Sequence, residues 1–273
     1  MCVFAKLADS RGMPGTALAG APAFVSPGSI VRRIWGNGDV VLFLFAGAAA
    51  EFSLNKEVDW LFFTGRLPAD PIGRMFSTVA YARSIIFSTA ADAHAAIDKI
   101  NAIHGAVEQK RGRPIPEWAY RDVLYMLIAY SISAYELLER KLRPEEREDV
   151  YDVFYRMGSR MGIANMPGSY AEWLPDRVVH MQRDLVMSKH TVQLFDAYRA
   201  HLGIVRYSIM RQVQGMLLPA PLREVLALST KPLFSVVLMV YKFLTKVRLG
   251  GICRNMLLPA AYREAALRLD VVC

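Results

Sequence analysis

Residues 123–138 read VLYMLIAYSISAYELL, a run that is apolar on every side of a helix with 3.6 residues per turn. Such a helix lies at the centre of a helical protein, because none of its faces prefers water. Two roles are open to the hydroxyl groups in this run: internal hydrogen bonds to neighbouring carbonyl groups, or the polar lining of a pocket. These hydroxyl groups belong to Tyr125, Tyr130, Ser131, Ser133 and Tyr135.

Helical periodicity extends from this run over most of the chain, with Pro and Gly between the apolar segments. No run rich in Val, Ile and Thr alternates between Asn-Gly turns, so we expect no sheet of any size. The sequence predicts an irregular Gly-, Pro- and Ala-rich segment over residues 1–30 and a single all-α domain over residues 31–273. The predicted helices cover residues 38–54, 72–86, 88–110, 117–140, 144–161, 174–187, 190–215, 219–228, 231–247 and 259–269.

The composition excludes several classes of protein. The chain has 273 residues, of which 53% are hydrophobic and 21% charged, and its formal net charge is +8. It is too apolar to be disordered and long enough to bury a core without disulfide bonds. The three cysteines (Cys2, Cys253 and Cys273) have no Cys-x-x-Cys spacing, which excludes a disulfide scaffold, a zinc ribbon and covalently attached c-type haem.

The most apolar runs, Val40–Ala50 and Leu233–Tyr241, are shorter than the roughly 18–20 residues that a membrane-spanning helix needs. Residues 1–30 also lack the apolar core of a signal peptide, so we expect a cytoplasmic protein. The basic stretch 242–248 (KFLTKVR) follows an apolar run, which leaves two interpretations open: a buried helix with a solvated end, or peripheral contact with a membrane. No Lys/Arg run is interleaved with aromatic residues, so we expect no nucleic-acid partner.

Most motifs of all-α enzymes are absent from the sequence. It contains no Glu-x-x-His pair for a di-iron site, no His-Glu-x-x-His zinc motif and no Asp-Asp-x-x-Asp motif. It also contains no Gly-x-Ser-x-Gly elbow and no phosphate-binding loop. The histidines are therefore the remaining candidates for a functional site.

His104 has the most distinctive surroundings of the five histidines. Its helical face continues through Ile100, Ile97 and Ala93. An imidazole on such an apolar face needs a partner, because a buried and unpaired polar group costs about 1–3 kcal/mol. A hydrogen-bonded core histidine and a metal or haem ligand are both open. The other histidines are expected elsewhere: His94 about 80° around the same helix, and His180, His190 and His201 on solvated faces near Arg183, Lys189 and Arg199.

Two motifs surround His104. Residues 70–78 read DPIGRMFST, and the Ala-rich helix that follows ends in Ile103-His104-x-x-Val107. Their order and spacing resemble the family of MpaB, an oxygenase of the mycophenolic acid pathway, and the latex-clearing rubber oxygenase. The family pattern is Asp-Pro-x-x-Arg-Leu-x-x-Thr followed by Ile-His-x-x-Val. The resemblance extends over residues 38–228 and includes Ser131-x-x-Ala-Tyr-Glu136, Met161-Gly-Ile163 and Leu217-Leu-Pro-x-x-x-Arg223.

The resemblance implies an all-α, globin-like fold that binds one b-type haem non-covalently and activates O2. It implies that His104 is the proximal ligand of the iron, and that Arg74 and Thr78 line the haem pocket as catalytic and cofactor-binding residues. Both fit the chemistry of haem, which needs an apolar cleft and one axial donor. The chain departs from the family at Ser77, where the rubber oxygenase has Lys, and at Tyr125 and Tyr130, where members commonly have His and Asp.

The function implied by the resemblance is that of a haem-dependent oxygenase or oxidase. Its substrate would be a hydrophobic, unsaturated small molecule of the terpenoid or polyketide kind, and its reaction would include oxidative cleavage of a C=C bond. Two alternatives are open. One is a haem-dependent cyclase or coupling enzyme without net oxygenation, and the other is a non-catalytic helical protein that carries haem or lipid.

Overall fold

The structure, a computed structural model, describes residues 21–63, 65–247 and 257–270. All three cysteines lie outside these residues. Within the described ranges the regular elements are α-helices, and strand-like pairing is limited to the isolated bridges Ala23–Thr89 and Asn55–Leu185. The all-α prediction is confirmed. The helices are α1 (Ile30–Gly36), α2 (Gly38–Phe52), α3 (Asp59–Phe63), α4 (Arg66–Ala69), α5 (Pro71–Ile86), α6 (Ala90–Arg111), α7 (Glu117–Leu138), α8 (Pro144–Met161), α9 (Tyr170–Asp184), α10 (Lys189–Leu217), α11 (Ala220–Val225), α12 (Pro232–Lys246) and α14 (Ala260–Leu267).

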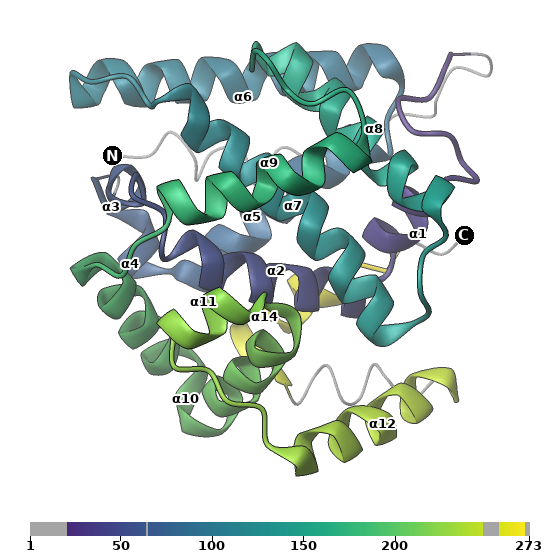
Figure 1. The fold of residues 1–273 in the computed structure, drawn as a ribbon, viewed down its shortest axis with the longest axis vertical. Coiled ribbons are helices and arrows are strands. Elements are labelled where there is room, and N and C mark those ends of the chain that lie inside the picture. Colours follow the sequence, from purple (N-terminus) through teal and green to yellow (C-terminus); the bar gives the residue numbers. More distant parts are fainter. Residues whose placement is uncertain (1–20, 64, 248–256, 271–273) are drawn as a thin grey trace.

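Helix α7, which contains the apolar run 123–138, lies at the centre of the fold (Figure 1). Its most extensive contact is with α2, and α8 packs on it as well. The rings of Tyr125 and Tyr130 are completely or almost completely buried. The prediction of a central, buried helix is therefore confirmed.

The contact between α2 and α7 depends on a glycine. A Cβ atom placed on Gly47 of α2 would lie only 2.5 Å from Cδ1 of Tyr130 on α7. Because such a separation is far below van der Waals contact, only glycine allows the two backbones to approach this closely. Gly47 therefore fixes the spacing of the central helix pair.

Capping residues define the first turn of α5. The side chain of Asp70 accepts a hydrogen bond of 2.8 Å from the backbone N–H of Gly73, and Pro71 occupies the first helical position. Both features are typical of helix starts. Asp70 and Pro71 of the DPIGRMFST segment therefore have a structural role, which is to start α5.

The observed helices agree with the predicted ones except for short elements and boundaries. Helices α1, α3 and α4 are missing from the prediction, and α9 begins at Tyr170, four residues earlier than predicted. The side chain of Ser169 accepts a hydrogen bond from the N–H of Glu172 and so starts α9 there. Helix α10 bends at Gly203, whose φ of 73° is accessible to glycine at little cost.

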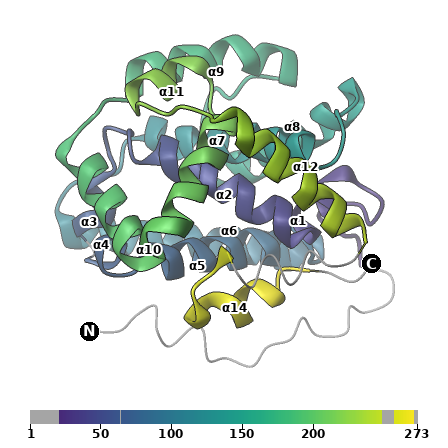
Figure 2. The same ribbon diagram turned by 90° about the horizontal axis from the view of Figure 1, so that it is seen from below.

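Helix α12 lies at the periphery of the molecule (Figures 1 and 2). Leu238 is its one buried residue, whereas Leu233, Val240 and Phe243 are 72%, 52% and 63% exposed. The interpretation of this segment as a buried helix with a solvated basic end is therefore wrong. No helix in the described part of the chain is both long enough and apolar enough to cross a membrane.

Candidate functional site

A cavity of about 290 Å³ lies among α2, α5, α6 and α7. Arg74, Thr78 and His104, the three site residues predicted from the sequence, all line it. Most of the wall is apolar, with Phe45 and Phe52 from α2 and Met126 and Leu127 from α7 among its side chains. The fold therefore brings the two sequence motifs to the same apolar cavity.

Helix α5 contributes Arg74 and Thr78 from successive turns. Four residues apart on an α-helix, they share one face. The hydroxyl group of Thr78 donates a hydrogen bond of 3.1 Å to the carbonyl oxygen of Arg74. Ser77, between them, is exposed and does not line the cavity. The position at which the rubber oxygenase has Lys thus faces away from this cavity.

Helix α6 contributes His104, whose imidazole ring lies against the ring of Tyr120 with 4.9 Å between centroids. Burial, together with the smaller effect of the positive charge of Arg74, lowers the pKa of His104 from its ordinary value of 6.5 to about 4. The imidazole is therefore neutral at pH 7, and a neutral imidazole has a lone pair with which it can bind a metal.

Glu108, one turn after His104 on α6, holds the start of α7 in place. Its Oε1 atom accepts hydrogen bonds from the hydroxyl group of Tyr120 at 3.0 Å and from the N–H of Ile115 at 2.9 Å. Burial and the hydrogen bond to Glu108 raise the pKa of Tyr120 above its ordinary range. Tyr120 is therefore a neutral hydroxyl group next to the candidate ligand.

A family model described as "ER-bound oxygenase mpaB/B'/Rubber oxygenase, catalytic domain" matches residues 32–245. The match covers more than half of the chain and includes every wall of the cavity. The chain belongs to the MpaB and rubber oxygenase family. Neither the curated proteins nor the solved structures give a match.

In this member of the MpaB/rubber oxygenase family, three tyrosines that were not predicted as site residues also line the cavity. Tyr81 belongs to α5, Tyr120 to α7 and Tyr198 to α10. Tyr81 and Tyr198 lie outside the motifs that carry the resemblance. Tyr81 is three residues after Thr78, so the helical spacing could have placed it beside the predicted site residues. No comparable signal points to Tyr198, because α10 is distant in sequence.

The hydroxyl groups of the central run form internal hydrogen bonds. Tyr125 donates to Asp176 at 2.5 Å, Tyr130 donates to Glu51 at 2.8 Å, and the hydroxyl oxygen of Ser131 accepts a bond from the indole of Trp35. None of these three residues lines the cavity. These three hydroxyl groups therefore form internal hydrogen bonds rather than line the cavity, but their partners are side chains of other helices and not the neighbouring carbonyl groups expected from the sequence.

Glu51 also forms a buried ion pair with Arg177. Its two carboxylate oxygens each accept a hydrogen bond of 2.5 Å from the guanidinium group, and both side chains are less than 10% exposed. A bidentate pair of this kind is the strongest arrangement of the two groups. It connects α2 with α9, and no motif or spacing in the sequence indicates it.

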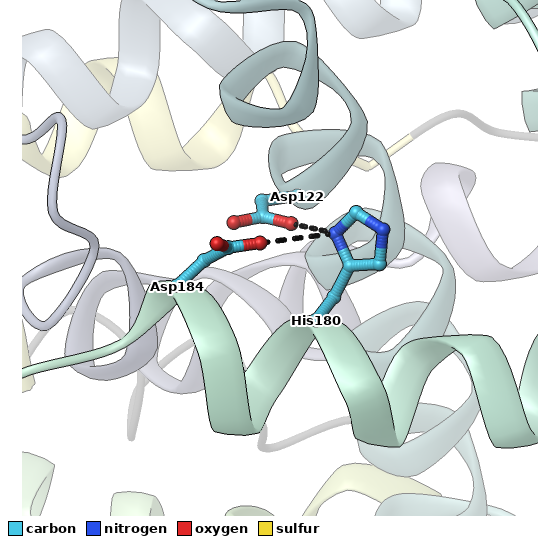
Figure 3. Close-up of side chains that lie close together, drawn as sticks. All are labelled: Asp122, His180 and Asp184. Carbon is cyan, nitrogen blue, oxygen red and sulfur yellow. Dashed lines mark hydrogen bonds and ion pairs between the residues drawn. The ribbon is translucent and has the colours of Figure 1, made fainter.

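The expectation that His180 lies on a solvated face is wrong. The side chain is 3% exposed, and its Nδ1 atom lies 2.6 Å from Asp122 and 3.3 Å from Asp184. Figure 3 shows both carboxylates beside the imidazole ring. The spacing of Asp176, His180 and Asp184 at four-residue intervals places all three on one face of α9, and this signal was available in the sequence. Arg183, by contrast, is half exposed.

The remaining histidines lie outside the cavity. His94 is exposed, with its ring edge against Phe24. His190 is close to Gln193, and His201 is within hydrogen-bond distance of the carbonyl oxygen of Ala69. Among the five histidines, His104 is the one that faces the cavity.

Proposed function

We propose that this protein is a haem-dependent oxygenase that binds one b-type haem in the cavity, enclosed by helices in a globin-like manner. O2 is its co-substrate, and a hydrophobic, unsaturated small molecule of the terpenoid or polyketide kind is its substrate. The observation that supports this proposal best is the meeting of Arg74, Thr78 and His104, from two separate motifs, at one apolar cavity. Membership of an oxygenase family supports the reaction class.

The residues around the cavity fit the chemistry of haem. The macrocycle is flat and apolar, and Phe, Leu, Ile and Met side chains form most of the wall. His104 offers a neutral nitrogen donor, since its pKa is lowered to about 4. Arg74 offers a cation that can pair with a propionate. The volume of about 290 Å³ is just below the range of about 300–1,000 Å³ that is typical of ligand pockets.

Each of these residues has a definite task in the proposed reaction. Haem, when bound, supplies the iron that reacts with O2. His104 would hold the iron and Arg74 would pair with the anionic edge of the group, while the hydroxyl oxygen of Thr78, which donates its proton to the carbonyl oxygen of Arg74, would accept hydrogen bonds inside the cavity. The apolar wall excludes water and positions an apolar substrate. Oxidative cleavage of a C=C bond is the reaction that we propose.

The haem content of the purified protein tests the role of His104. We expect His104→Ala to lose most of its haem or to show a displaced Soret band, because a b-type haem is retained by burial and one axial bond. His190→Ala and His201→Ala, which lie outside the cavity, are the controls and should keep the wild-type spectrum. Normal haem content and an unchanged spectrum in His104→Ala would exclude His104 as the ligand.

Arg74 is tested by activity rather than by haem content alone. We expect Arg74→Ala to lower turnover by at least tenfold while the yield of folded protein stays close to that of the wild type. The reason is that Arg74 lies on the cavity wall, and loss of a charge-assisted hydrogen bond costs about 1.5–3 kcal/mol. Unchanged turnover at unchanged haem content would remove Arg74 from the site.

Oxygen uptake and product mass separate the alternatives. An oxygenase consumes O2 in the presence of an unsaturated apolar substrate and gives a product with added oxygen mass. A cyclase or coupling enzyme gives a product without added oxygen, and a carrier of haem or lipid leaves the compound unchanged. The membership of an oxygenase family favours the first outcome.

We also propose that α12 makes a peripheral contact with an anionic membrane. Leu233, Val237 and Val240 of α12 are at least half exposed, and they recur at the three- and four-residue spacing of one helical face. Lys231 and Lys246 lie exposed at the two ends of the helix. Apolar side chains flanked by lysines are typical of helices that lie in the membrane interface. The family description, which names an ER-bound oxygenase, agrees with this contact.

A further inference from the structure

A second cluster of metal-binding side chains lies outside the cavity. It consists of Asp122 from α7 and of His180 and Asp184 from α9, and Figure 3 shows the two carboxylates directed toward the same nitrogen of the imidazole ring. One candidate ligand atom from each residue lies within 4.8 Å of the others. All three side chains are 5% exposed or less. None of them lines the cavity.

Two carboxylates facing one imidazole nitrogen is an unusual arrangement. Nδ1 of His180 lies 2.6 Å from Oδ1 of Asp122 and 3.3 Å from Oδ2 of Asp184. A single N–H group points along one line, so it cannot form a good hydrogen bond with both oxygens. A cation between the three atoms would satisfy both carboxylates and the lone pair of the nitrogen. One His and two Asp side chains are a donor set suited to Zn²⁺ or Mn²⁺.

Surrounding groups orient the cluster. The side-chain amide of Asn55 donates a hydrogen bond of 2.9 Å to Oδ2 of Asp122, which leaves Oδ1 directed at the imidazole. On the other side of the ring, Nε2 of His180 lies 3.9 Å from Oδ2 of Asp176. In the metal-bound state the proton of the imidazole would lie on Nε2, on the side of this carboxylate, as is common for histidines that bind metals.

A positively charged group already approaches the position between these atoms. Nη2 of Arg183 lies 2.6 Å from Oδ2 of Asp184 and 3.2 Å from Nδ1 of His180. Nε of Arg183 also donates a hydrogen bond of 2.8 Å to Oδ1 of Asp184, so a metal ion would have to displace this bidentate pair. The side chain of Arg183 is 52% exposed, so it can move into solvent once the pair is broken. The guanidinium group therefore acts as a replaceable cation above a buried, negatively charged site.

We propose that Asp122, His180 and Asp184 form a binding site for a divalent transition-metal ion of the Zn²⁺ or Mn²⁺ class, and that Arg183 covers the site when no metal is bound. A dication neutralises the two carboxylates, which removes the cost of burying them. The ion would join α7 to the end of α9. The isolated bridge Asn55–Leu185 attaches that end to the segment after α2, so the site would connect three parts of the chain.

Equilibrium dialysis of the full-length chain against Zn²⁺ and against Mn²⁺ tests this proposal, after removal of bound metals with a chelator. The wild type should bind one equivalent of at least one of the two ions per chain, with a rise in melting temperature. Asp184→Asn should weaken the binding at least tenfold. Arg183→Gln should strengthen it at least tenfold, because the competing cation is gone. His190→Gln, on the surface of α10, should bind as the wild type does.

Two outcomes would overturn the proposal. In the first, neither the wild type nor Arg183→Gln binds an equivalent of metal, and the cluster is then a buried ion network closed by Arg183. In the second, Asp184→Asn binds as tightly as the wild type, and the metal is then held elsewhere. If Asp184→Asn fails to fold, as judged by circular dichroism, the comparison of Arg183→Gln with the wild type decides alone.

Discussion

At the scale of single residues, the environment of His104 decides what the cavity can bind. Burial and the nearby Arg74 guanidinium favour the neutral imidazole, and they lower its pKa to about 4. A charged imidazolium could not bind a metal, whereas a neutral imidazole can do so throughout the physiological pH range. Because the folded chain disfavours the charged imidazole, the free energy of unfolding is expected to fall at acidic pH.

The pH dependence of stability follows from this shift. Between pH 6.5 and 4 the unfolded chain binds a proton at His104 that the folded chain does not bind, so the free energy of unfolding falls as the pH is lowered. We expect His104→Asn to lose less stability over this range than the wild type. Urea unfolding of the haem-free protein at pH 7, 5.5 and 4.5 measures the difference.

A cavity variant without a titrating group provides the control for this experiment. Ile100→Ala removes a side chain from the cavity wall and should lower the stability by a similar amount at each pH. Parallel curves for His104→Asn and the wild type would mean that the imidazole titrates normally in the folded chain. The argument for a neutral ligand at His104 would then fail.

At the scale of elements, the spacing between α2 and α7 depends on Gly47. A side chain at this position would clash with Tyr130, whose hydroxyl group is bonded to Glu51 and so cannot move away freely. We expect Gly47→Ala to lower the free energy of unfolding by about 1–3 kcal/mol, the usual cost of overpacking a core. Chemical denaturation at pH 7 measures this change.

Gly105 on α6 is the matched control, because a Cβ atom there has nothing within 4 Å. Alanine favours the helical state over glycine by about 0.5–1 kcal/mol, so Gly105→Ala should be neutral or stabilising. Equal destabilisation by the two substitutions would show that helix packing at Gly47 has no special role.

The helices could be predicted from the sequence where periodic apolar runs end at Pro or Gly. The ten predicted helices correspond to α2 and α5–α12 together with α14. Helices α1, α3 and α4 have seven residues or fewer, which is too short for the apolar period to repeat. The sequence therefore predicts long helices well, and among the short ones it predicts α11, whose start is marked by Pro219 and Pro221.

The candidate site was predictable only in its motif residues. Arg74, Thr78 and His104 belong to short local patterns, and the fold places all three on one cavity. Tyr198 reaches the same cavity from α10, and Asp122 meets His180 across two helices. Such contacts between distant segments leave no periodic signal. The spacing of His180 and Asp184 on one helix face was visible in the sequence, but their meeting with Asp122 became visible only with the three-dimensional structure.

At the scale of the whole molecule, the distribution of apolar surface is uneven. Exposed apolar side chains on α12 form one continuous helical face, whereas the exposed Ile204 and Val205 on α10 are neighbours in sequence next to the bend at Gly203. A continuous apolar face on a helix with basic ends can enter a membrane interface, and an isolated pair cannot contribute as much. The positive net charge of the chain would add attraction to anionic lipids.

Binding to lipid vesicles tests the proposed membrane contact. We expect the wild type to co-sediment with vesicles that contain phosphatidylserine, less with pure phosphatidylcholine vesicles, and less at high salt. The double substitution Val240→Glu and Phe243→Glu should weaken binding at least tenfold, because two apolar side chains no longer enter the interface and two negative charges repel the lipid. Both side chains are more than half exposed, so the fold should tolerate the change.

The pair Ile204→Glu and Val205→Glu is the control, since these side chains are at least as exposed but lie on α10. The control adds the same two negative charges, so it separates the effect of net charge from the effect of position. Equal losses in the two double variants would mean that charge alone governs binding, and α12 would not be the contact. A concentration-dependent dimer in gel filtration, abolished by the α12 substitutions alone, would assign the apolar face to self-association instead.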